Sequence, residues 1–300
     1  MLGSAACWGL ATVMSRDLLS SMSSARLLVL QLAGSVLFLL VLSAPAFPWR
    51  YRDRRLARGA LIGVLEPGLA YAVGLIGLSM TTAGNASVIG ATEPMLIVLV
   101  AWVWLREAPG ARLLAAIAVA VGGVALTSWA GSPGHGEAAP AGDALIVLAT
   151  LFAASYVVLS SRFAPDFPAA TLAAAQQIVG LCFAIALFAG VSAAGLGHGS
   201  FADLSPGLLA YAALSGVAQY ALAFWLYLIG LKSLPASAAG LWLTMVPVFG
   251  LFGAWVWLGE VPSVLTLAGA ALIVAANVWA NLSQAHDGAN PAGTAEGPRT

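Results

Sequence analysis

Charged residues are scarce in this sequence. Asp, Glu, Lys and Arg make up 8% of 300 residues, whereas hydrophobic residues make up 61% and the mean hydropathy is +0.94. Soluble domains carry roughly 25% charged residues, which coat their water-facing surface. This chain cannot coat such a surface. Its composition therefore excludes a soluble globular protein and predicts one embedded in a lipid bilayer.

Other scarcities exclude further classes of function. The net charge is zero, which leaves no basic surface for nucleic acid. Cys7 and Cys182 lie in apolar stretches without nearby histidines, so we expect neither a disulfide nor a metal site. HExxH, GxSxG and GxxxxGK[ST] motifs are absent, as are paired aspartates within the apolar runs. We therefore expect no enzyme, no cofactor and no nucleotide-driven pump.

Long apolar runs are abundant, and they are continuous rather than alternating, which favours helices over a barrel. A bilayer core needs about 20 apolar residues per helix. The runs predict an all-α integral membrane protein with ten transmembrane helices. These are expected at 2–20, 26–47, 57–79, 83–105, 111–130, 143–163, 169–194, 206–231, 236–258 and 262–282.

Basic residues are distributed unevenly between the two expected sides. With ten spans, the side with both termini would hold ten of the twelve lysines and arginines, and the other side only Arg16 and Arg26. Lys and Arg concentrate in cytoplasmic loops. We therefore expect both termini in the cytoplasm and the loops near Glu137, Asp143, His198 and Asp203 on the outside.

Two segments of the sequence repeat without a gap. Gly77–Pro109 aligns with Gly230–Pro262, so that Pro94 matches Pro247 and Glu107 matches Glu260, both 153 residues apart. The string AWVWL also recurs, starting at Ala101 and Ala254. Apolar composition alone does not align prolines, tryptophans and a glutamate at one offset. We interpret the pattern as an internal duplication.

Each repeat holds five expected spans, and an odd number makes the second half enter the membrane from the opposite side. Inverted repeats of this kind build many secondary transporters, whose binding sites lie near the membrane midplane. We expect a first five-helix repeat at 1–130, a loop at 131–142, a second five-helix repeat at 143–282 and a disordered tail at 283–300.

The small residues, mid-helix prolines and helix-ending glutamates of 94–107 and 247–260 resemble the EamA branch of the drug/metabolite transporter superfamily. Trp8-Gly9, Ser15-Arg16 and Ser161-Arg162 resemble the first-helix ends of its two halves. The resemblance covers the chain to about Leu282. It implies a multi-pass protein of the bacterial inner (plasma) membrane that exports small metabolites. Among the functions found in this branch, the resemblance favours that of the bacterial amino-acid exporters, including the aromatic exporter of the YddG type.

Two glutamates, Glu66 and Glu93, lie in the middle of expected spans, each before a proline. A mid-membrane charge is costly and usually faces a cavity or a partner. Proline kinks a helix and frees carbonyls one turn back. Either glutamate would bind a cation, a proton or a substrate ammonium, or else only brace the kink. Glu107 and Glu260 end their helices near water, where capping a neighbouring helix or pairing with Arg112 is the favoured task.

Neutral polar and aromatic side chains also occur within the spans, where they would either contact cargo or join helices. We select Tyr71, which is near Glu66, together with Tyr156, Gln219 and Trp242. The predicted substrate-binding set is therefore Glu66, Tyr71, Glu93, Tyr156, Gln219 and Trp242. Further candidates are Gln31, Asn85, Gln176, Gln177, Tyr220, Thr244 and Asn277, whereas Trp8 fits either role.

No lysine or arginine lies in the middle of a span, which argues against phosphorylated cargo. We expect a secondary transporter that exports amino acids or similar small metabolites by alternating access, acting as a monomer in the lipid bilayer. Efflux of drugs or toxic compounds is an alternative, and a channel or facilitator is an alternative of another class. Proton coupling and diffusion down the cargo's own gradient both fit the sequence.

Overall fold

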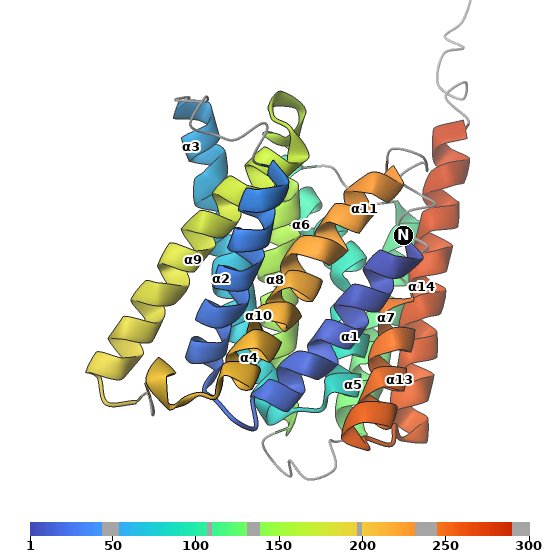
Figure 1. The fold of residues 1–300 in the computed structure, drawn as a ribbon. Helices are drawn as coiled ribbons and strands as arrows, with labels where there is room; N and C mark the ends of the chain where they lie inside the picture. Colours follow the sequence, from blue (N-terminus) through green and yellow to red (C-terminus); the bar gives the residue numbers. More distant parts are fainter. Residues whose placement is uncertain (44–53, 107–109, 131–138, 197–199, 232–244, 290–300) are drawn as a thin grey trace, which may run out of the picture.

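The computed structural model describes residues 1–43, 54–106, 110–130, 139–196, 200–231 and 245–289, and within these ranges every regular element is helical. The helices run side by side between two ends of the molecule (Figure 1). The long elements are α1 (Leu2–Leu18), α2 (Ser24–Ser43), α7 (Ala111–Trp129), α8 (Ala139–Ser160), α9 (Ala169–Ala193) and α14 (Val264–Ala289). The shorter ones are α3 (Arg54–Leu61), α4 (Ala70–Met80), α5 (Ala83–Gly90), α6 (Glu93–Leu105), α10 (Pro206–Gly216), α11 (Ala223–Leu231) and α13 (Val246–Leu258).

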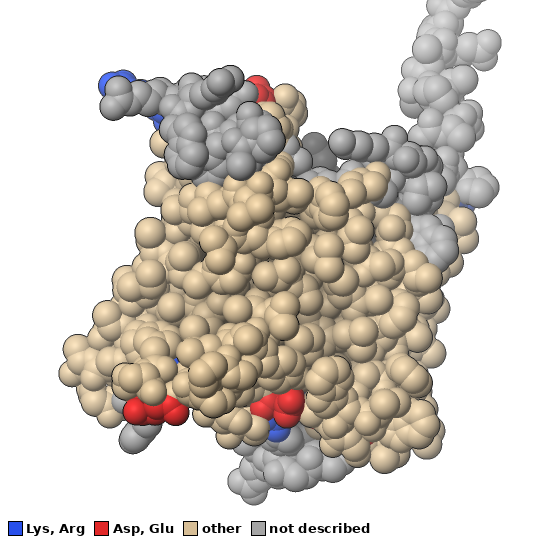
Figure 2. All heavy atoms as spheres, viewed as in Figure 1, with Lys and Arg blue, Asp and Glu red and all other residues tan. Residues whose placement is uncertain are grey.

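The helices are apolar enough for a membrane. Seven of the described helices or helix runs are long and apolar enough to cross a bilayer, and the bent pair α5 and α6 makes an eighth if it is counted as one span. The face in Figure 2 is almost free of charge across its middle, and the visible charged atoms gather near the two ends. Such a belt matches the hydrocarbon core of a bilayer, in which exposed charge is unfavourable.

Several expected spans are broken rather than continuous. The third passes from α3 through the 3₁₀ turn η3 (Ile62–Val64) and the π-helical turn η4 (Leu65–Leu69) into α4. The fourth bends by 42° between α5 and α6. The predicted kinks at Pro67 and Pro94 are thus confirmed, because both breaks lie at or beside these prolines. The eighth also contains a π-helical turn, η8 (Val217–Leu222), although this segment contains no proline.

Local structure repeats at the offset found in the sequence. Helices α6 and α13 each have 13 residues, with a proline in the first turn. Each ends at a residue with a left-handed backbone, Arg106 at φ 60° and Gly259 at φ 69°. Helices α7 and α14 begin at Ala111 and Val264, again 153 positions apart. The duplicated sequence therefore forms matching helices with matching ends.

Some expected boundaries are corrected by the structure. Helix α8 begins at Ala139, inside the expected loop 131–142. Asp143, expected in an outward loop, is 1% exposed and accepts a hydrogen bond from the Thr81 hydroxyl at 2.6 Å. This end of α8 lies inside the bundle, where Gly142 packs closely against Gly77 of α4.

The last helix is also longer than expected. Helix α14 continues to Ala289, seven residues into the segment 283–300 that was assigned to a disordered tail. Polar residues such as Ser283 and Gln284 do not interrupt an α-helix where the chain leaves the bilayer, so loss of apolar character was a poor marker of the helix end.

Glycines allow the helices to approach closely at a few crossings. Gly123 of α7 and Gly269 of α14 lie against each other, and a β-carbon on either would meet the other's backbone. Gly63 of η3 meets the backbone of Gln176 in α9, and Gly216 of α10 meets the backbone of Gln31 in α2. Small residues at contacts are how membrane helices pack without a hydrophobic driving force. These crossings position the interior residues described next.

Candidate functional site

Glu66 lies where the third span loses its helical backbone. Its φ of −143° and ψ of 124° are extended, and Pro67 directly after it has no N–H to donate. The Glu66 side chain is half-buried among the helices. Irregular backbone at membrane depth is tolerated where it is covered by protein or lines a polar space. The break therefore gives Glu66 both an interior position and a polar environment.

Glu66 and Tyr71 are joined directly. The Tyr71 hydroxyl donates to Glu66 Oε1 at 2.9 Å, one turn farther along the same span. The Tyr71 ring packs on Tyr220 of η8, with ring centroids 4.2 Å apart. The acid of the third span is thereby connected through one aromatic contact to the eighth span.

Tyr220 continues the polar network to α1 and α2. Its hydroxyl donates to Gln31 Oε1 at 2.9 Å, and Gln31 Nε2 donates to the hydroxyls of Ser15 and Ser215 at 2.8 and 2.9 Å. Ser15 in turn donates to Gln219 Oε1 at 3.4 Å. Gln31 is fully buried, and both ends of its amide are satisfied. The predicted site residue Gln219 therefore lies beside this network rather than at lipid.

Glu93 lies at the bend between α5 and α6, at the start of α6, with Pro94 next to it. Its carboxyl is near enough to that of Glu66 for the two to interact electrostatically. Tyr71, Tyr156 and Tyr227 also lie within electrostatic range of Glu93. Two breaks in two spans thus bring both predicted acids into one tyrosine-rich region.

Tyr156, which lies on α8 in the second half of the sequence, belongs to the same region. Its hydroxyl donates to Gln176 Oε1 at 2.7 Å, while Gln176 Nε2 donates to the Gly59 carbonyl and to Ser160. Tyr156 is also within electrostatic range of Glu66. Its position is fixed by Gln176, which is 2% exposed.

Five of the six predicted substrate-binding residues are therefore placed by the structure in one interior region, where their roles stay predictions. The sixth, Trp242, lies outside the described residues, as does Thr244. Tyr227 was not singled out from the sequence. Its spacing of seven residues from Tyr220 would have placed both tyrosines on one face of a helix.

Glu260 caps a neighbouring helix, which is one of the two structural roles expected for it from the sequence. Its Oε1 accepts from the Ala83 N–H at 3.2 Å, and its Oε2 accepts from the Gly84 N–H at 3.1 Å. These are orphan donors of the first turn of α5, and a carboxylate there also complements the helix dipole. Glu260 thus caps a helix of the other half of the chain. Its repeat equivalent, Glu107, lies outside the described residues.

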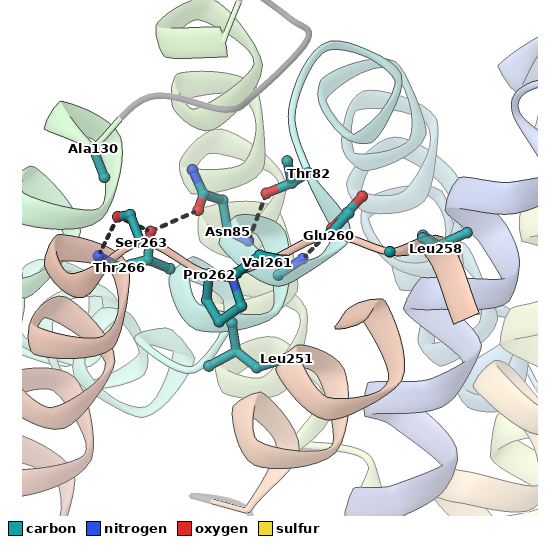
Figure 3. Close-up of a pocket in the computed structure, with 12 residues that line it drawn as sticks. Thr82, Asn85, Ala130, Leu251, Leu258, Glu260, Val261, Pro262, Ser263 and Thr266 are labelled. Atoms are coloured by element: carbon teal, nitrogen blue, oxygen red, sulfur yellow. Dashed lines mark hydrogen bonds between the residues drawn. The ribbon is translucent and has the colours of Figure 1, made fainter. Parts of the chain in front are cut away.

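A cavity of about 390 Å³ adjoins this cap. Figure 3 shows Glu260 beside the start of α5, with Asn85, Ser263 and Thr266 linked by hydrogen bonds across the opening to α14. None of the five predicted substrate-binding residues that the structure describes lines it. The cavity is therefore distinct from the acidic and aromatic region in the interior.

The chain resembles known transporters over most of its length. Residues 1–129 and 140–282 match the model of the EamA-like transporter family. A probable terminal-alkyne amino-acid exporter of Streptantibioticus cattleyicolor is 32% identical over 196 residues, which are 64% of this chain and 62% of that protein. The uncharacterized transporter YetK of Bacillus subtilis is 26% identical over 202 residues, or 67% of this chain and 60% of that protein.

The alignments thus span about three fifths of each curated relative. A solved crystal structure of a protein shares the fold, with a TM-score of 0.61 and 21% identity over 95% of this chain and 96% of that one. It carries no information about cargo. The family match, by contrast, covers almost all of the helical part of the chain, including the broken third, fourth and eighth expected spans. This multi-pass membrane protein belongs to the EamA-like transporter family.

Proposed function

We propose that this protein is a secondary transporter that exports amino acids, aromatic ones among them, or similar small amphiphiles. The observation that carries the proposal is the pair Glu66 and Glu93, held within electrostatic range of each other among Tyr71, Tyr156 and Tyr220. Such a set favours a cargo with an ammonium group and an apolar part. The carboxylates would attract the ammonium, and tyrosine faces would add cation–π and apolar contact.

A relative's function agrees with this class of cargo. One curated relative carries the name of a probable exporter of terminal-alkyne amino acids, which combine a zwitterionic head with a small unsaturated side chain. Because no lysine or arginine lies in the middle of an expected span, phosphorylated cargo is disfavoured. The relative supports amino-acid cargo without specifying the side chain.

Alternating access is the mechanism we propose, based on two inverted five-helix repeats. Two equivalent glycine crossings support it, because Gly63 on Gln176 and Gly216 on Gln31 relate the halves to each other. The two glycines are 153 positions apart, the offset of the sequence repeat. In such an architecture, each half adopts either of two conformations, and exchange of these conformations opens the site first to one side and then to the other.

The arginine and lysine distribution supports a bacterial inner membrane protein with cytoplasmic termini. We expect reporter fusions at the C-terminal tail and in the loop 131–138 to report opposite sides of the membrane. If both reporters gave the same side, an odd number of spans between them would be ruled out and the ten-span topology would be wrong.

The direct test of function is counterflow in proteoliposomes. The purified protein is reconstituted into vesicles preloaded with unlabelled alanine, leucine, phenylalanine or tryptophan, and uptake of the labelled amino acid is measured with and without a pH gradient. We expect saturable counterflow of at least one amino acid, reduced at least tenfold in Glu66→Gln or Glu93→Gln. Val103→Ala is the control, because Val103 is 72% exposed on the apolar surface.

The same assay distinguishes the alternatives. The acidic and aromatic residues would also fit a lipophilic cation, so tetraphenylphosphonium is included as a probe of drug efflux. Counterflow of tetraphenylphosphonium but of no amino acid would establish that alternative. Uptake that rises linearly with cargo concentration and shows no counterflow would indicate a channel and contradict alternating access.

A further inference from the structure

One stripe of α1 is buried except at its middle. Ser4, Trp8, Ala11 and Ser15 follow the spacing that places residues on one helix face. Ser4, Ala11 and Ser15 are at most 2% exposed, whereas Trp8 between them is only half-buried. Leu10 lies on another face, where it is 36% exposed and packs near Gly253 of α13. Trp8 therefore keeps accessible surface on a face of α1 that is otherwise buried.

The eighth span carries the matching stripe. Tyr220, Ala223 and Tyr227 lie on one face; the first two are buried, whereas Tyr227 is half-buried. Ser4 donates to the Ala223 carbonyl at 2.7 Å and so joins the two stripes. Trp8 and Tyr227 form a second contact between the same two helices, with ring centroids 5.9 Å apart. The two helices are thus joined by a hydrogen bond and by an aromatic pair that keeps accessible surface.

Tyr227 connects this aromatic pair to the acids. It lies within electrostatic range of Glu93, and its ring also neighbours Phe224, with centroids 6.5 Å apart. Among the described residues, its hydroxyl has no hydrogen-bond partner, unlike those of Tyr71, Tyr156, Tyr211 and Tyr220. A tyrosine that only braced two helices would be expected to be buried and bonded, as Tyr220 is.

We propose that Trp8, Phe224 and Tyr227 form the apolar subsite that holds the side chain of the cargo, next to Glu93, which holds its ammonium. The inference rests on the proposed function and deepens it. An aromatic wall beside one carboxylate selects amino acids with apolar, aromatic or unsaturated side chains over small ones. None of these three residues lines the cavity beside Glu260.

The proposal predicts a change of selectivity rather than a general loss of transport. Replacing Trp8 with leucine removes the ring from the subsite but keeps an apolar side chain on α1. We expect Trp8→Leu and Tyr227→Leu to lower kcat/KM for phenylalanine and tryptophan roughly tenfold relative to alanine, the scale of a lost aromatic contact in an apolar pocket. Tyr227→Phe should keep the wild-type selectivity, because the hydroxyl has no partner.

Counterflow of labelled alanine, phenylalanine, tryptophan and propargylglycine would be measured for each variant after size-exclusion chromatography. Trp129→Leu is the matched control, because Trp129 is 86% exposed and distant in sequence from both stripes. A wild-type protein that moved no amino acid would refute the proposed function and this inference with it. A wild-type protein that moved alanine in preference to the apolar amino acids would overturn the subsite alone.

A uniform loss for all cargos in Trp8→Leu and Tyr227→Leu would also overturn the subsite, because it would assign the two rings to packing. The selectivity ratio is measured within one preparation, so a lower yield of folded protein does not alter it. If one variant fails to fold, the other and Tyr227→Phe still decide the question.

Discussion

The two halves of the chain share the glycines at which helices cross closely, but they differ in the acidic residues of their spans. At the offset of 153 residues, Gly63 corresponds to Gly216, and both meet the backbone of a buried glutamine. At the same offset, however, Glu66 corresponds to Gln219 and Glu93 to Val246. Both mid-membrane acids thus belong to the first half. The positions that let helices approach are common to the halves, whereas the positions that face the interior are not.

On the proposed function, the shared positions belong to the scaffold and the unshared interior positions to the cargo site. Gln31 and Gln176 do the same work in both halves, since each accepts from a tyrosine and donates to a serine. The tyrosines come from non-equivalent places, however: Tyr220 corresponds to Pro67, and Tyr156 lies on α8. In the proposed transporter, a duplicated scaffold with an asymmetric lining would hold one cargo in one orientation.

The largest loss of stability is expected at the glycine crossings, where the two halves are most alike. Gly63→Val and Gly216→Val each place a side chain where a β-carbon would overlap the backbone carbonyl of Gln176 or Gln31. A backbone cannot yield as a flexible side chain does, so we expect a destabilisation of about 3 kcal/mol or more and loss of the monodisperse peak in fluorescence-detected size-exclusion chromatography. Gly190→Val is the control, because nothing lies within 4 Å of its would-be β-carbon.

If Gly216→Val were tolerated while Gly63→Val were not, the two crossings would differ in structural importance. That result would remove the main structural support for equivalent halves, although it would leave the sequence repeat intact.

The next effect tests the chemical asymmetry. Glu66→Gln gives the first half the residue that the second half already has at the equivalent position. We expect transport to fall at least tenfold with folding retained, because glutamine keeps the shape and the hydrogen bond from Tyr71 but not the charge. The double variant Glu66→Gln with Gln219→Glu should remain inactive, since the charge is then placed beside Ser15 rather than Tyr71.

Restored transport in the double variant would show that only the total interior charge matters, and the specific position of Glu66 would lose its importance. Wild-type rates for both Glu66→Gln and Glu93→Gln at every pH would remove the acids from the mechanism and leave a neutral, gradient-driven facilitator.

How far the sequence predicted the structure depends on the kind of signal. Apolar runs and Pro67 and Pro94 identified the helices and two of the breaks, because bilayer thickness and the missing proline N–H act locally. The π-helical turn η8 was not foreseen, since Val217–Leu222 contains no helix breaker. Directly before this turn, Gly216 lies close to the backbone of Gln31 in α2, a tertiary contact that the local sequence does not reveal.

The site shows the same division. Glu66 and Glu93 could be selected because a carboxyl in an apolar run is visible in one dimension. Their proximity could not be derived, since it depends on how two bent spans fold against each other. Trp8 and Tyr227 were not assigned either, because aromatic residues in a membrane helix look alike whether they face lipid, a neighbour or cargo.

The smallest effect concerns the cap that one half provides for the other. Glu260→Ala removes the acceptor of the Ala83 and Gly84 N–H groups at the start of α5. Loss of a helix cap costs about 1 kcal/mol, so the melting temperature should fall by a few degrees while the cargo selectivity is unchanged. Glu260→Gln, which keeps one acceptor oxygen, should fall between Ala and wild type.

The sequence repeat predicts the same task for Glu107, so Glu107→Ala should lower the melting temperature by a similar amount, as measured by differential scanning fluorimetry. Equal shifts would extend the likeness of the halves from their crossings to their caps. A shift for Glu260→Ala alone would confine capping to the second half, whereas a loss of transport in Glu260→Ala at unchanged melting temperature would mean that Glu260 acts on cargo rather than on α5.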